Sequence, residues 1–258
     1  MWQLEDFGFA SIEQLFDTGV VVSAELREQL SRIAPVVLAA EQVLPVPEVF
    51  HELLRGRGLQ RGWTLRVEGA ASARAMTWAL LGGVTTAGGW IASVDVPGVG
   101  LAAAQEVGVA IERVLVVNTP DPPAWSASIG ALIGSVDVIV FGEPQHRVVP
   151  TEFRRMSSRA RERGSVLVEL ASTTGSKRGS QLQYDLTFDV HPVGWRGIGA
   201  GYGRLQGRIL EVEASGRRIG GAPRRARYEL PAAAGSLRVV EPEARILPMP
   251  TPREQQVG

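Results

Sequence analysis

The chain has 258 residues, 45% of them hydrophobic, and a formal net charge of zero, so it can bury one sizeable core and carries no global charge that selects a nucleic-acid or an acidic partner. It contains no cysteine, which excludes disulfides, thiolate metal sites and cysteine nucleophiles. No cationic segment with an apolar core opens the chain and no apolar run approaches the roughly 18 residues of a membrane span, so we expect a cytoplasmic protein.

Residues 1–62 are expected to form an N-terminal helical segment. From about Ser23 an apolar stripe recurs at intervals of three and four residues, which is typical of one helix face, and Pro35 predicts a kink within it. Two interpretations stay open: the stripe packs on the chain's own core, or it docks on another molecule. As candidate partner-binding residues we take Leu26, Leu30, Ile33 and Val37.

Residues 63–170 alternate between apolar runs and helical patterns. The runs read "WTLRVE", "GWIASVD", "RVLVVN", "VDVIVFG" and "SVLVEL", as in strands buried on both faces of a parallel sheet. Helix candidates between them lie near residues 74–82, 100–108, 124–134 and 151–163. This alternation predicts an α/β fold with a mainly parallel sheet.

Residues 182–230 change to a period of two, with glycine-rich turns between the segments. This pattern predicts antiparallel strands that extend the same sheet, so residues 63–230 form one core. Residues 231–258 are rich in Pro, Ala and Glu and are expected to be a disordered tail.

The stretch "LRVEGAASARAM", residues 65–76, has the outline of a phosphate-binding loop without its chemistry. Gly69 follows an apolar strand, as the first glycine of such a loop does. Arg74 occupies the position of the second glycine, Ala75 that of the phosphate-binding lysine, and Met76 that of the hydroxyl residue that holds magnesium. We therefore expect no nucleotide cofactor.

The strand "VDVIVFG" would end in the magnesium-side aspartate of a nucleotide hydrolase, but Gly142 is found there. Glu143 follows it and is interpreted as a turn residue beside Pro144. Asp95 ends another strand and could act as a general base, yet nothing is present for it to activate. The three histidines lie far apart without metal-ligand spacing, so we predict no metal site and no catalytic residue.

Basic residues are concentrated late in the chain, and 26 of the 27 are arginine. Residues 177–227 hold ten basic and four acidic side chains. These arginines either contact nucleic acid or simply solvate the strand faces; with few aromatic residues among them, we expect weak DNA binding at most. The nucleic-acid candidates are Lys177, Arg178, Arg217, Arg218, Arg224, Arg225 and Arg227.

From about residue 50 to 230 the chain resembles the RecA core in register. The segment "ELLRGRGLQRGWTLRVEG" resembles the entry into the P-loop strand, "SVDVIVFGE" the Walker B strand, and "GRILEVEASGRRIGGAPRRARYEL" the late hairpin. The resemblance implies a RecA-like three-layer core with an N-terminal helical lead-in. Pro97 or a neighbour stands in place of the catalytic glutamate, and both DNA-binding loops are short, so the chain departs from an active recombinase.

With erased ATPase motifs and an arginine-rich composition, the chain is similar to the actinobacterial ImuA-type proteins. That resemblance implies a non-catalytic accessory protein of an inducible, mutagenic DNA-repair system that carries out translesion synthesis after DNA damage. It implies an ImuB-type protein related to Y-family polymerases as partner, with an error-prone C-family polymerase and RecA as further candidates. The alternative is a DNA-binding module that uses the basic C-terminal third directly.

Overall fold

The computed structural model describes residues 43–55, 58–142, 144, 146, 148–171, 183–198, 203–230 and 237–240. The predicted stripe of Leu26, Leu30, Ile33 and Val37 lies outside the described residues, as do Lys177, Arg178 and Glu143. Residues 42–258 form one compact unit. Within the described ranges, no helix combines the length and the apolar character needed to cross a membrane.

The unit is built on a nine-stranded sheet with the order β11-β10-β9-β8-β3-β7-β6-β4-β5. Six neighbouring strands, from β8 to β5, are mutually parallel. They are β3 (Thr64–Glu68), β4 (Ile91–Val94), β5 (Val114–Val117), β6 (Val138–Gly142), β7 (Val166–Leu170) and β8 (Leu186–Ile198). All five strands predicted for residues 63–170 are therefore confirmed.

The sheet continues through antiparallel pairs, as the period-two pattern predicts: β8 with β9 (Gly203–Ser215) and β9 with β10 (Arg224–Leu230). A last strand, β11 (Arg238–Val239), pairs with β10, and Val240 beside it is buried. The structure thus places a short strand and a buried valine within the segment that the sequence predicts to be a disordered tail.

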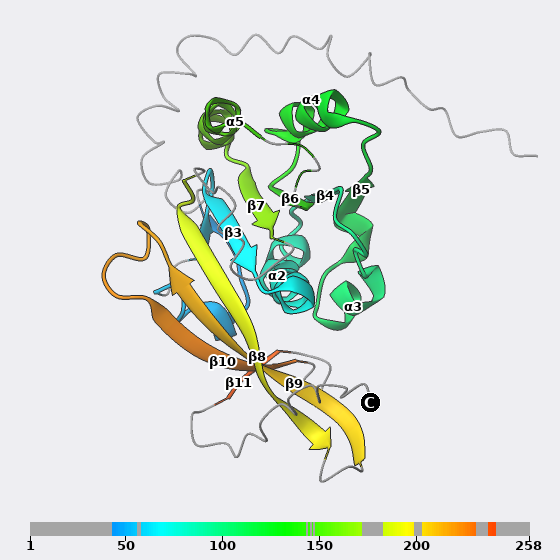
Figure 1. Cartoon of the computed structure of the whole chain (residues 1–258), viewed down its shortest axis with the longest axis vertical. Coiled ribbons are helices and arrows are strands. Elements are labelled where there is room, and N and C mark those ends of the chain that lie inside the picture. The colour runs from blue at the N-terminus through cyan, green and yellow to red at the C-terminus, as the bar shows by residue number, and fades with distance from the viewer. Residues whose placement is uncertain are drawn as a thin grey trace, which may run out of the picture. The chain divides into compact units, whose positions relative to one another are not determined.

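Helices cover both faces of the sheet (Figure 1). α2 (Ala70–Thr86) and α3 (Leu101–Glu106) pack on one face, and α4 (Pro122–Leu132) and α5 (Pro150–Arg163) on the other. Strand residues alternate between the two cores: Val138 and Val140 face α2, whereas Ile139 and Phe141 face α4 and α5. This is the predicted three-layer α/β arrangement.

Local signals explain the ends of α5. Pro150 occupies its first turn, where the missing N–H is not needed, and Gly164 closes it in the left-handed conformation with φ 78°. The start of α2 differs from the prediction. The pattern placed that helix near residue 74, but it begins four residues earlier because small residues continue it back to the glycine that ends the strand.

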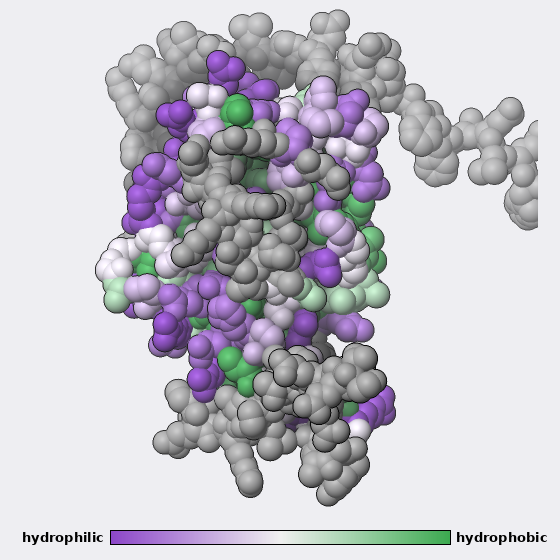
Figure 2. Space-filling model, in the orientation of Figure 1, coloured by the Kyte–Doolittle hydropathy of each residue, from purple (hydrophilic) through white to green (hydrophobic). Residues whose placement is uncertain are grey.

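Strand β5 lies at the free edge of the parallel part of the sheet, so the prediction that it is buried on both faces is wrong. Leu115 and Val116 are 41% and 46% exposed, because no helix in the described part of the chain covers them. Figure 2 shows apolar residues along this side of the molecule, over β5 and α3, while hydrophilic residues cover most of α5. The exposed apolar edge is a candidate contact surface.

Residues 43–60 pack on the α2 side of the sheet. They contain β1 (Val43–Leu44), the short helix η2 (Glu48–Phe50) and β2 (Leu59–Gln60), and β1 pairs with β2 antiparallel. The Phe50 ring lies 5.1 Å from the Tyr228 ring of β10. This stretch, which the sequence assigns to the N-terminal helical segment, thus contributes side chains to the same core as the sheet.

Candidate functional site

A single residue, Gly69, joins β3 to α2. Its φ of 128° lies in the region that favours glycine, and a Cβ at this position would overlap the carbonyl oxygen of Val190 on β8. The amides of Ser72 and Ala73 donate to the Gly69 carbonyl at 3.0 and 3.3 Å, which commits them to the first helical turn. A phosphate-binding loop needs several residues between strand and helix to curl around the phosphates. Here the residues that would form the loop instead form the first turn of α2.

The three residues that replace the rest of the P-loop motif lie on α2 and have other contacts. Arg74 extends to the loop after β4 and donates from Nη1 to the Pro97 carbonyl at 2.5 Å. Ala75 is half-buried, and Met76 lies in the core, 3% exposed. The position of a magnesium-binding hydroxyl therefore faces the protein interior.

The Walker B position is covered by the loop that follows β4. A Cβ on Gly142 would overlap the carbonyl oxygen of Asp95 and would lie 3.2 Å from Cδ of Pro97. The same loop is held from the other side by Arg74 and by the indole N–H of Trp78, which donates to the Val99 carbonyl at 2.9 Å. No side chain of any kind fits at residue 142 without moving this loop.

Asp95, the candidate general base, has a structural contact. It is a non-glycine residue with a φ of 48°, and its carboxylate accepts hydrogen bonds from both the amide (2.8 Å) and the hydroxyl of Thr119. These contacts tie the carboxyl end of β4 to that of β5. The side chain is thus committed to holding the loop that covers Gly142.

Beneath α5, a buried ion-pair network joins β3 and β7. Arg66 donates to Glu169 at 2.8 Å and to Glu68 at 2.6 Å, and the Tyr184 hydroxyl donates to Glu169. Burial alone would lower the pKa of Arg66, but the carboxylates outweigh it and raise that pKa. Burial and the Glu169 carboxylate raise the pKa of Tyr184 well above its ordinary value, so its hydroxyl stays protonated and donates.

The nucleic-acid candidates on β10 are largely neutralised. Arg225 pairs with Glu213 at 2.6 Å and Arg227 with Glu211 at 2.8 Å, across the β9–β10 pairing. Arg224 donates to the Glu52 carbonyl. Because each of the first two arginines has its own carboxylate, this strand face presents little net positive charge to a polyanion.

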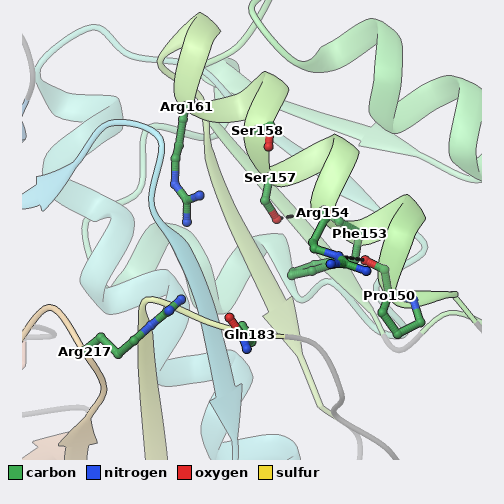
Figure 3. A pocket seen from close by; sticks show the side chains of 8 residues that line it. All are labelled: Pro150, Phe153, Arg154, Ser157, Ser158, Arg161, Gln183 and Arg217. Carbon is green, nitrogen blue, oxygen red and sulfur yellow. Dashed lines mark hydrogen bonds between the residues drawn. The ribbon is translucent and has the colours of Figure 1, made fainter.

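Arg217 and Arg218 follow β9 and lie elsewhere, near α5. Figure 3 shows Arg217 and Arg161 pointing into the same hollow from opposite sides. This pocket has a volume of about 620 Å³. We call it the α5 pocket; the described residues that line it are Pro150, Phe153, Arg154, Ser157, Ser158, Arg161, Gln183 and Arg217.

A buried aspartate stands behind the α5 pocket. Asp185, 1% exposed, accepts from the amide and the hydroxyl of Thr64, both at 3.1 Å, and pairs with Arg161 (3.1 Å) and Arg218 (3.4 Å). Burial would raise the pKa of Asp185, but the Thr64 hydrogen bonds and Arg161 outweigh burial and hold that pKa below its ordinary value. Asp185 is therefore charged and fixes Arg161 in place.

Sequence reasoning found one member of the α5 pocket, Arg217, and missed Arg154 and Arg161. The helical spacing of "TEFRRMSSRARER" marked its arginines as a solvated face, since periodicity cannot tell a solvated helix face from one that borders a hollow. The only signal for a special role is Asp185, a carboxylate just before a strand, and its two arginine partners are far away in sequence.

Comparisons with known proteins agree with this architecture. The family model for the MT3502 N-terminal domain matches residues 52–175. An uncharacterized protein of Mycobacterium tuberculosis, Rv3395c, is 32% identical over 152 residues, which cover 57% of this chain and 72% of that protein. The crystal structure of the RadB recombinase superposes with a TM-score of 0.55 at 13% identity, covering 75% of this chain and 97% of RadB.

The likeness to RadB concerns the fold alone, and it identifies the three-layer core as RecA-like. The likeness to Rv3395c is one of sequence and extends over most of that protein. The chain therefore belongs to the family of Rv3395c, and its core has a RecA-like fold.

Proposed function

We propose that the protein is a non-catalytic accessory component of an inducible, mutagenic DNA-repair complex and acts through protein–protein contacts during translesion synthesis. The observation that carries this proposal is a RecA-like fold whose nucleotide site is filled: α2 begins directly after Gly69, and the loop after β4 covers Gly142. A RecA-like core without a working nucleotide site still has a stable fold and exposed surfaces. Such surfaces can bind other proteins.

The loss of charge at the nucleotide site supports the same proposal. A lysine or aspartate that has lost its phosphate or metal partner, if buried, leaves an unpaired charge that costs on the order of several kcal/mol. Ala75, Met76 and Gly142 carry no charge, and Met76 instead adds to the core. Selection for a stable binding scaffold would favour these replacements once hydrolysis had no use.

The proposed partner is an ImuB-type protein related to Y-family polymerases. Two surfaces are candidates for the contact. One is the N-terminal stripe, represented by Leu30 and Ile33, whose spacing suits a helix docked in a groove. The other is the exposed edge of β5 at Leu115 and Val116, which has no strand partner among the described residues and could accept a further strand.

Co-purification of the full chain with the ImuB-type protein tests the proposal. The double variants Leu30→Asp/Ile33→Asp and Leu115→Asp/Val116→Asp introduce the same charge at the two surfaces, so each serves as the control for the other. We expect the first to abolish co-purification while circular dichroism shows a folded protein. Loss only in the second would move the contact to β5. If the first variant unfolds, the stripe residues pack in the protein's own core. If the wild-type protein does not co-purify with the ImuB-type protein, the proposal is contradicted.

A further inference from the structure

The α5 pocket gathers positive charge from segments far apart in the sequence. Arg154 and Arg161 come from α5, and Arg217 from the turn after β9 (Figure 3). Among the described residues that line the pocket, none is acidic. Arg154 donates to the Pro150 carbonyl at 3.2 Å, and neither it nor Arg217 has a carboxylate partner among the described residues. Both cations are therefore available to an anion.

The buried carboxylate of Asp185 does not neutralise the pocket. Asp185 is shared between Arg161 and Arg218, while Arg154 and Arg217 line the pocket without an ion pair to Asp185. Asp185 instead orients Arg161: within the described part of the chain, only Nη2 of that guanidinium is engaged, which leaves Nε and Nη1 as donors. An oriented guanidinium loses less entropy when it binds an oxyanion.

The spacing of the arginines selects the kind of anion. Arg154 and Arg161 are seven residues apart on α5, which is roughly 10 Å along the helix axis. Arg154 bends back toward Pro150, away from Arg161. A single small phosphate cannot lie against both guanidiniums, whereas a chain of linked phosphates can. Between the arginines, the Ser158 hydroxyl and the Gln183 amide offer further donors.

We propose that the α5 pocket binds the phosphate backbone of a single-stranded nucleic acid, through Arg154, Arg161 and Arg217. This binding goes beyond the protein-contact role and does not depend on it. The described lining residues offer no exposed aromatic platform, since Phe153 is buried against Tyr184 with 5.2 Å between ring centroids. Bases therefore do not stack here, and the affinity is non-specific and electrostatic, with a dissociation constant on the order of 10⁻⁵ M at roughly physiological salt.

The test measures fluorescence anisotropy of a labelled oligo-dT strand with the full-length protein over a salt series. The pocket variant is Arg154→Gln/Arg217→Gln, which removes two arginines that have no carboxylate partner among the described residues and so spares folding. The control is Arg225→Gln/Arg227→Gln, which makes the same change in net charge on β10, where both arginines are paired.

We expect the pocket variant to bind about tenfold more weakly, with the slope of log affinity against log salt smaller by about 1.4, since two phosphate contacts are lost. The control is expected to bind within twofold of the wild type.

Equal losses of affinity in both variants would show that binding follows net charge and would overturn the proposal. Unchanged binding by the pocket variant, or no binding by the wild type, would overturn it as well. Inorganic phosphate that displaces the strand at micromolar concentration would reassign the pocket to a small phosphate. A poly-glutamate peptide that binds as tightly as oligo-dT would reassign it to an acidic protein.

Discussion

At the carboxyl ends of β3 and β6, α2 begins directly after Gly69, a Cβ at residue 142 would overlap the Asp95 carbonyl, and none of the motif residues Ala75, Met76 and Gly142 is charged. Beside α5, near the amino ends of β3 and β8, Arg161 and Arg218 pair with one buried carboxylate, and Arg154 and Arg217 line the same pocket as Arg161. The two regions share one sheet. The positions of the motif lysine, hydroxyl and aspartate carry no charge, whereas the pocket beside α5 gathers arginines, so we expect anion binding beside α5 and not at the motif positions.

The largest effect is expected from the carboxylate behind the α5 pocket. Asp185→Ala removes the only acidic partner that the described residues give Arg161 and leaves the buried amide and hydroxyl of Thr64 without this acceptor, so the free energy of unfolding should fall by about 2 to 4 kcal/mol. Urea denaturation at neutral pH measures the change. A loss below about 1 kcal/mol would mean that Asp185 does not organise this end of the sheet.

At the other end, Gly142→Ala tests whether the Walker B position is closed. The added Cβ overlaps the Asp95 carbonyl, so the loop after β4 must shift, and we expect a loss of about 1 to 3 kcal/mol. Gly130→Ala in α4 is the matched control, because a Cβ there makes only an ordinary contact at 3.7 Å. That change should stabilise the helix by about 0.5 to 1 kcal/mol. If both substitutions stabilise the protein, the position is open.

The effect of Asp185 should depend on pH in a defined direction. Its pKa in the folded protein lies below its ordinary value of 3.8. The stability it contributes is thus fully present above the unfolded-state pKa and is lost as pH falls through the lower folded-state pKa. We expect the difference in unfolding free energy between wild type and Asp185→Asn to be constant from pH 7 to 5 and to shrink below about pH 4. A difference that grows on acidification contradicts a charged Asp185.

The smallest effect is expected on β10. Arg227→Gln breaks a partly exposed pair with Glu211, and such pairs contribute at most about 1 kcal/mol. Thermal unfolding should therefore shift by only a few degrees, far less than for Asp185→Ala. An equal shift would erase the distinction between paired surface arginines and those organised by a buried carboxylate.

Much of the fold could be predicted from the sequence, because apolar runs and their period report directly which residues are buried. The five central strands, the antiparallel extension and the end of α5 at Gly164 follow from such local patterns. Exposure of Leu115 could not be predicted, since an apolar run does not reveal whether its strand lies at the edge. Strand β11 could not be predicted, because a strand of two residues is too short to show an alternating pattern.

The sequence predicts which nucleotide-binding residues are missing, but not which contacts the residues at those positions make. Arg74, Ala75, Met76 and Gly142 could be placed by spacing alone, but the overlap of Gly142 with the Asp95 carbonyl depends on a loop 47 residues earlier in the chain. The α5 pocket likewise joins Arg161 and Arg217, which only the folded sheet brings together. Contacts between distant segments leave no periodic signal in a single sequence.

The most direct measurement of the central claim is isothermal titration calorimetry of the purified full-length chain with ATP and magnesium. Because the residues that would form the P-loop are helical and the Walker B position is covered, we predict no heat of binding at millimolar ATP. The variant Ala75→Lys, which restores the motif lysine alone, should behave in the same way. Magnesium-dependent binding of ATP by the wild type with a micromolar dissociation constant would contradict a closed nucleotide site.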